Sequence, residues 1–157
     1  MQVAFGVSTF AKTSFNYYPS MDKKALNSDL IQIIEKKIEL AGIDYANEKY
    51  DEVEDELHEI EDAFIDTYGD ELEEVISKVY KKISPKSDVM LPIAYIAKEY
   101  HKIDIESGVD YKPLDEEGVP VDIQGFEDQD TRLVFVPSPV RLLLVINSGT
   151  SKEVWKA

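Results

Sequence analysis

Hydrophobic residues recur every three or four positions through the middle of the chain, which is the spacing of an amphipathic helix. The first helix is predicted to begin at Asn27 or Ser28, because either side chain can cap a helix. It is predicted to end at Ala41, with Gly42 just past its end. Its apolar stripe is broad, so this helix should be well buried; the stripe comprises Leu30, Ile31, Ile33, Ile34, Ile38, Leu40 and Ala41.

Two further helices are predicted between Asp44 and Pro85. Asp44 can cap the first of them, and Gly69 ends it; Asp70 then caps the second, which stops before Pro85. Because the link at Tyr68 and Gly69 is short, these two helices are expected to pack as an antiparallel hairpin. Their apolar seams are Tyr50, Val53, Leu57, Ile60 and Phe64 in the first, and Leu72, Val75, Ile76, Val79, Tyr80 and Ile83 in the second.

Strand patterns lie at the two ends of the chain. Residues 2–10 alternate between larger and smaller side chains with the period of a half-buried strand. Residues 131–136 and 140–146 flank a Pro-Ser-Pro turn and predict a hairpin. The second run is apolar on both faces, so it should lie centrally in a sheet that helices cover.

The remaining segments give weaker signals. Residues 89–101 fit either a helix with Pro92 in its first turn or a buried strand. Residues 104–130 are rich in Asp, Glu, Gly and Pro, and predict loops around short edge strands at most. The tail from Asn147 is polar, and the lone Trp155 is expected to fold back.

These elements together predict a single α+β domain over residues 1–157. We expect a small, mostly antiparallel sheet, formed by the N-terminal strand and the C-terminal hairpin and packed against three or four helices. The helical part is predicted at about 28–101 and the C-terminal β part at about 103–147.

The net charge of −15 changes the picture of function. Such a field repels phosphate backbones and anionic lipids, so we expect neither direct nucleic-acid binding nor membrane binding. The absence of cysteine excludes a disulfide framework and thiolate metal sites. With no secretion signal visible at the start of the sequence, a cytoplasmic protein is expected. The sequence does not predict the oligomeric state.

The acidic residues concentrate in one run. Thirteen Asp or Glu and no Lys or Arg lie between Asp51 and Glu74. Five of them fall within one sector opposite the apolar seam, and like charges at that spacing cost a few tenths of a kcal/mol each. A face that tolerates this repulsion favours a basic protein partner, as for an inhibitor, an immunity protein or a phage-type accessory protein. The five residues are Glu52, Asp55, Glu59, Asp62 and Asp66.

A solvated helix face is the alternative explanation for the same run. The acids from Asp70 to Glu74 lie in the first turn of a predicted helix, where the helix dipole stabilises negative charge. Lys78, Lys81 and Lys82 suit the opposite end of that helix. On this interpretation the chain is a structural subunit whose acidity serves solubility only.

A metal site is the third interpretation. Two carboxylates three residues apart on each of two antiparallel helices can supply four oxygen ligands, and Glu56, Glu59, Glu71 and Glu74 have that spacing. The segments DELHEIEDAF and ELEEVI resemble the two ligand helices of MazG-like nucleotide pyrophosphohydrolases, whose pattern is EExxE, a gap, then ExxD. The resemblance implies Mg²⁺ or Mn²⁺ held by these carboxylates, and water activated to cut a nucleoside triphosphate between its α and β phosphates.

Helical geometry ranks these interpretations. At 100° per residue, Glu59 lies roughly 130° from the apolar seam, and Glu74 lies roughly opposite the stripe of its own helix. Lys78 follows Glu74 by four residues, which is the spacing of a favourable surface pair. We therefore expect a non-enzymatic interaction protein first and a metal-dependent hydrolase as the alternative.

Overall fold

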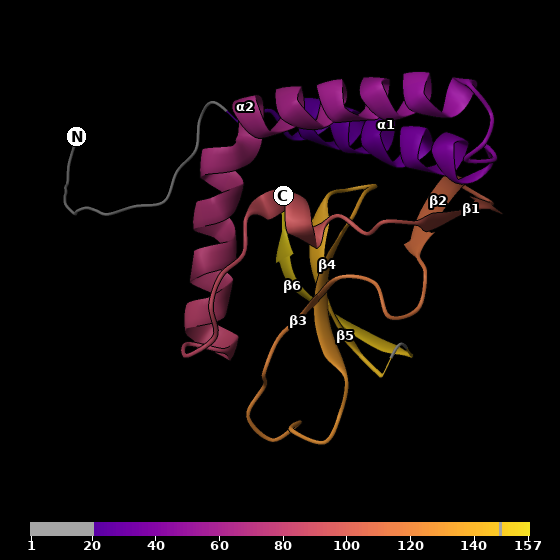
Figure 1. The fold of residues 1–157 in the computed structure, drawn as a ribbon. Coiled ribbons are helices and arrows are strands. Elements are labelled where there is room, and N and C mark those ends of the chain that lie inside the picture. The colour runs from indigo at the N-terminus through magenta and orange to yellow at the C-terminus, as the bar shows by residue number, and fades with distance from the viewer. Residues whose placement is uncertain (1–20, 148) are drawn as a thin grey trace, which may run out of the picture.

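The structure is a computed structural model that describes residues 21–147 and 149–157 (Figure 1). The strand predicted at residues 2–10 lies outside the described residues. In the described part the chain forms two α-helices, one 3-10 helix (η1) and six strands. In chain order they are α1 (Lys23–Ala41), α2 (Lys49–Ile83), η1 (Pro92–Tyr95), β1 (Tyr100–Ile105), β2 (Gly108–Pro113), β3 (Val119–Pro120), β4 (Thr131–Val136), β5 (Arg141–Ile146) and β6 (Thr150–Lys156).

Helix α1 begins one turn earlier than predicted. Asp22 is the cap, and its side chain accepts hydrogen bonds from the backbone N–H groups of Lys24 at 2.9 Å and Ala25 at 3.1 Å. The earlier start adds Leu26, which is fully buried, to the apolar stripe. The predicted end at Ala41 is confirmed, and the N–H of Gly42 closes the last turn.

Helix α2 is continuous, so the prediction of three or four helices with a break at Gly69 is wrong. Figure 1 shows that α2 bends: its first half runs beside α1 and its second half runs beside the strands. A glycine inside a helix costs about 1 kcal/mol. Tyr68 and Leu72, on either side of Gly69, are both buried, and burying each gains roughly 2 kcal/mol. The partner of the first half is therefore α1 and not the second half of the same helix.

The strands form two antiparallel sheets and not the one small sheet predicted. Strands β1 and β2 pair with each other, and the larger sheet has the order β3-β4-β5-β6. The predicted hairpin is confirmed as β4 and β5, with Leu133 opposite Leu144. The central place of β5 is also confirmed, because β4 and β6 flank it. The polar tail forms β6, which places Trp155 opposite Leu142.

Residues 89–101 form neither the long helix nor the buried strand that the sequence allowed. This segment contains only the short η1, and β1 begins at Tyr100. Strands β1 and β2 occupy much of the stretch that was predicted as loop. The sequence pattern did not indicate them, because their side chains are largely exposed and show little alternation of apolar and polar residues. The buried hydroxyl of Tyr100 donates to the carbonyl oxygen of Phe135 at 2.8 Å and so ties this segment to β4.

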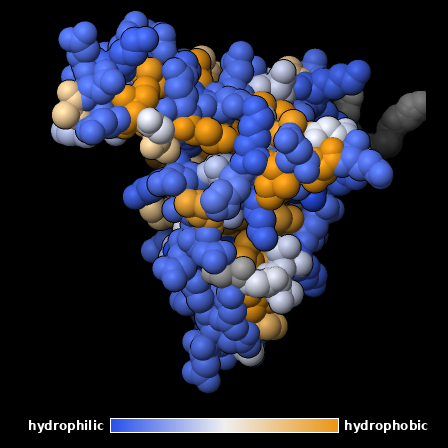
Figure 2. All heavy atoms as spheres, turned by 90° about the vertical axis from the view of Figure 1, so that its right-hand side faces the viewer, coloured by the Kyte–Doolittle hydropathy of each residue, from blue (hydrophilic) through white to orange (hydrophobic). Residues whose placement is uncertain are grey.

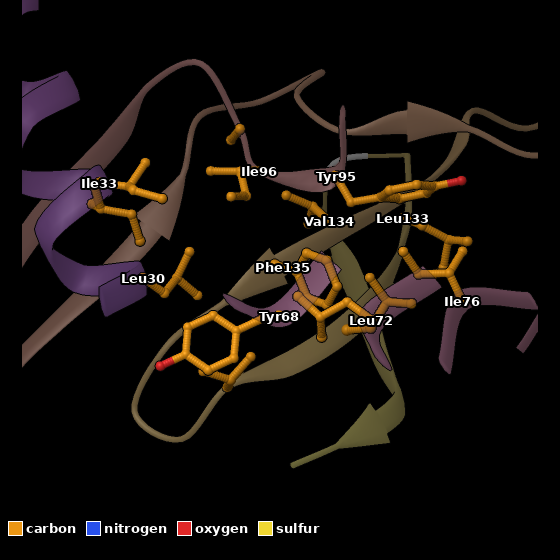
Figure 3. Close-up of a cluster of buried hydrophobic side chains, with 14 of the residues drawn as sticks. Leu30, Ile33, Tyr68, Leu72, Ile76, Tyr95, Ile96, Leu133, Val134 and Phe135 are labelled. Atoms are coloured by element: carbon orange, nitrogen blue, oxygen red, sulfur yellow. The ribbon is translucent and has the colours of Figure 1, made fainter. Parts of the chain in front are cut away.

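The core lies where both halves of α2 meet α1, η1 and β4 (Figure 3). In the close-up Leu30 of α1 and Tyr68 of α2 lie on one side of Phe135 of β4, and Leu72 and Ile76 of α2 lie on the other. Aromatic rings extend this core towards β6. The ring centroid of Phe135 is 6.3 Å from that of Tyr95 and 6.4 Å from that of Trp155, both edge to face.

One polar cluster joins the β1–β2 hairpin to α1. Glu35 of α1 pairs with Lys102 of β1 at 2.8 Å and accepts a hydrogen bond from the hydroxyl of Tyr111 of β2. The hydrogen bonds from Lys102 and then Tyr111 lower the pKa of Glu35 below its ordinary value of 4.5. Burial and the Glu35 carboxylate raise the pKa of Tyr111 to about 12. The charged form of Glu35 is therefore the form that holds the hairpin.

Gly118 should be the more sensitive of two glycines with positive φ. At Gly118 (φ +101°) an added Cβ would lie 2.6 Å from the carbonyl oxygen of Leu133, whereas at Gly125 (φ +91°) it would meet nothing within 4 Å. We expect Gly125→Ala to cost about 1 kcal/mol from backbone strain, and Gly118→Ala to cost clearly more because β3 must also move away from β4. Urea unfolding measures both losses. Equal losses would contradict the close approach of β3 to β4.

Stability should depend on pH through Glu35. Because its pKa is lowered in the folded state, its contribution is complete above the ordinary value of 4.5 and is lost as the pH falls through the folded pKa. Lys102→Gln should lower the free energy of unfolding by up to about 1 kcal/mol at pH 7 and by much less at pH 3. Urea unfolding at both pH values measures this, with Lys112→Gln as the control on the neighbouring strand. A loss that is the same at both pH values would contradict the charged pair.

Candidate functional site

The five carboxylates predicted as a binding face form one exposed row on the first half of α2. We call this row, Glu52, Asp55, Glu59, Asp62 and Asp66, the acidic ridge. All five side chains are exposed, and they recur at steps of three and four residues. Val53, Leu57 and Phe64 of the same half are buried in the opposite direction. The ridge therefore spans roughly 20 Å along the helix and points to solvent.

Lysines of α1 neutralise the edge of the acidic run but not the ridge. Lys36 pairs with Glu56 at 3.1 Å, and Lys37 pairs with Glu61 at 3.6 Å. These pairs draw α1 and α2 together along one side. None of the five ridge carboxylates forms an ion pair with a residue that the structure describes. The ridge thus carries five charges that no described residue pairs with, and Asp51, Glu54, Asp70 and Glu73 of the same run form no ion pair with a described residue either.

The four carboxylates of the metal interpretation do not converge. All four lie on α2, and Glu56 and Glu71 are separated by roughly 20 Å of helix. Glu56 pairs with Lys36, and Glu74 forms its expected pair with Lys78 at 3.5 Å. Within residues 21–147 and 149–157, no three His, Asp or Glu side chains gather closely enough to hold a metal ion. The antiparallel helix pair needed to bring Glu56, Glu59, Glu71 and Glu74 together is not formed.

A surface of opposite charge lies beside the second half of α2, and the sequence patterns did not reveal it. Lys23, Lys78, Lys82 and Lys156 line a hollow between α2 and β6. In the sequence, Lys78 and Lys82 are accounted for by the negative end of the helix dipole, and Lys156 belongs to a polar tail, so none of them indicates a binding surface. Only the fold brings these distant segments together. The sequence signal that remains is the lysine spacing of four residues on one helix.

Apolar side chains are also exposed among the described residues. Tyr45 and Leu91 are the most exposed, Val89 and Met90 are exposed beside Leu91, and three more lie on the β1–β2 hairpin. Ile105 is 47% exposed, and Ile103 and Val109 are somewhat less so. Figure 2 shows the side of the molecule on which this hairpin lies, where apolar patches are separated by polar side chains. Scattered exposure of this kind is normal for a protein surface, so the hairpin is not the strongest candidate for a binding site.

Comparisons with protein-family models, with curated proteins and with solved structures found no match to this chain. Of the helices in the described part, none combines the length and the apolar character that crossing a bilayer requires. Among the described residues, the acidic ridge and the hollow beside β6 are two surfaces that concentrate charge of one sign.

The separated carboxylates should give no specific metal site. Calorimetric titration with Mn²⁺ at moderate salt is expected to show weak, unsaturable heats, because the four carboxylates are spread along α2 and do not converge on one point. Glu56→Gln should leave those heats unchanged, and Asp104→Asn serves as a control acid on β1. Saturable micromolar binding that Glu56→Gln removes would contradict the extended arrangement of α2.

Proposed function

We propose that the protein is a non-enzymatic, cytoplasmic interaction protein whose acidic ridge binds a basic protein partner. Inhibitors, immunity proteins and phage-type accessory proteins are the functional classes that use this chemistry. The observation that carries the proposal is the exposure of all five ridge carboxylates in one row, with no ion pair to a described residue.

The ridge lies on a rigid element, which favours a binding role. The buried residues of α2 fix the helix against α1, so the five carboxylates keep their relative positions before a partner arrives. Binding then orders few groups, and less free energy is lost on association. The repulsion between neighbouring carboxylates is relieved when lysines or arginines of the partner approach. This relief makes association favourable and speeds encounter at low salt.

A solvated face is the competing explanation, and position distinguishes it from binding. If acidity serves solubility only, every exposed carboxylate contributes equally to the attraction of a cation. If the ridge is a binding surface, carboxylates within it contribute far more than carboxylates elsewhere. Asp104 and Glu106 at the tip of the β1–β2 hairpin are exposed and provide acids outside the ridge for comparison.

Charge reversal in the ridge should weaken binding of a basic protein more than the same reversal elsewhere. Asp55→Lys/Glu59→Lys and Asp104→Lys/Glu106→Lys change the net charge equally. With lysozyme as the basic probe, we expect the ridge variant to bind about tenfold more weakly, mainly through slower association, and the hairpin variant to bind about twofold more weakly. Surface plasmon resonance at several salt concentrations measures both rates. Equal effects of the two variants, or rates independent of salt, would contradict a localised acidic binding surface.

A further inference from the structure

The hollow between the second half of α2 and β6 is strongly basic in an otherwise acidic molecule. We call it the lysine groove. It measures about 420 Å³, and four lysines line it: Lys23, Lys78, Lys82 and Lys156. No Asp or Glu is among the described residues that line it, although Asp and Glu outnumber Lys and Arg by 32 to 17 in the whole chain. Lys78 pairs with Glu74, whereas Lys23, Lys82 and Lys156 form no ion pair with a described residue. An anionic occupant relieves the repulsion among these cations.

The floor of the groove is apolar. Val75 and Val79 of α2 form its buried wall, and Val154 and Trp155 of β6 are half-buried on the other side. A larger hollow adjoins it, because Lys82 and Val154 also line that second hollow. The charges there are mixed, with Lys86 and Lys152 beside Asp88, Asp122 and Glu127. An apolar floor with a cationic rim fits an occupant that carries both apolar and acidic groups.

The backbone beside the groove is able to pair with another strand. Among the described strands, β6 pairs only with β5, so its other edge has no strand partner in the described chain. An edge strand presents unpaired N–H and C=O groups, to which an extended peptide can add. Strand β6 carries Lys152 and Lys156 and one exposed acid, Glu153, so its net positive charge favours an acidic peptide over a basic one. The edge therefore selects by charge.

We propose that the lysine groove binds an extended acidic peptide of a partner protein, which adds to β6 as a further strand. Its apolar side chains pack on Val154 and Trp155, and its carboxylates pair with Lys23, Lys82 and Lys156. The acidic ridge of a second copy is a poorer occupant, because its exposed row is acidic throughout and offers no apolar side chain for the floor. This site is separate from the acidic ridge and does not depend on it.

Trp155 provides a direct readout, because it is the only tryptophan in the chain and lies in the groove. The full chain is titrated with an eight-residue peptide of alternating Glu and Val while the tryptophan emission is followed. Saturable binding with a shift of the emission to shorter wavelength is expected, because the peptide excludes water from the indole. Peptides of alternating Lys and Val, and of alternating Ser and Val, serve as controls and are expected to leave the emission unchanged.

Substitutions in the rim test whether the lysines select the peptide. Lys23→Glu/Lys82→Glu should weaken binding of the Glu–Val peptide at least tenfold, because two attractions become repulsions. Lys98→Glu/Lys112→Glu changes the net charge equally at exposed positions outside the groove and should change the affinity by less than threefold. Circular dichroism establishes that each variant is folded. The emission should respond to the peptide in the wild type and in the control variant alike.

Three outcomes would overturn the proposal. The first is an unchanged tryptophan emission at millimolar Glu–Val peptide. The second is equal affinity for the Ser–Val peptide, which would show that charge does not select the occupant. The third is a concentration-dependent oligomer in sedimentation velocity that Lys23→Glu/Lys82→Glu dissociates, because a second copy would then be the occupant. Loss of binding at the acidic ridge alone would leave all three measurements unaffected, so the two sites are tested separately.

Discussion

Helix α2 has to bury apolar side chains against two different surfaces, and this constraint organises the molecule. Along its first half Val53, Leu57 and Phe64 are buried, and along its second half Leu72 and Ile76 are buried. A straight helix can lie along only one flat surface. The bend seen in Figure 1 lets one continuous helix lie beside α1 and then beside the sheet. The core forms on the inside of this bend, where both partners converge.

The same constraint separates the charges. Because the first half of α2 packs on α1, its outer face is the one that collects carboxylates, and Lys36 and Lys37 are placed at the edge of the helix pair. Because the second half lies beside β6, Lys78 and Lys82 of the helix line the same hollow as Lys156 of the strand and Lys23 at the start of α1. The net charge of −15 is thus distributed unevenly, with an acidic ridge on the first half of α2 and a lysine groove beside the second half.

Local patterns in the sequence correctly predicted the elements whose ends are set by interactions between residues close together in the chain. The end of α1 at Gly42 and the hairpin of β4 and β5 follow from capping and from apolar runs, and both were predicted. The continuity of α2 was not, because the cost of Gly69 is local whereas the burial of Tyr68 and Leu72 that offsets it depends on tertiary contacts. The acidic ridge was predictable from a single helix, and the structure exposes all five of its residues. The lysine groove was not, because it joins three segments that are far apart in the sequence.

The two charged surfaces are far enough apart to act independently. Roughly 28 Å of helix separates Glu59, at the centre of the acidic ridge, from Lys78, which lines the lysine groove. At physiological ionic strength charges are screened over about 8 Å, so neither surface weakens the local potential of the other appreciably. Long-range repulsion by the net charge remains at low salt and slows the approach of an acidic peptide more than that of a basic protein. Added salt should therefore weaken association at the ridge steadily, whereas at the groove it screens an unfavourable long-range field as well as the favourable short-range pairs. The salt dependence of the groove is expected to be the shallower of the two for this reason, even though both sites recognise charge.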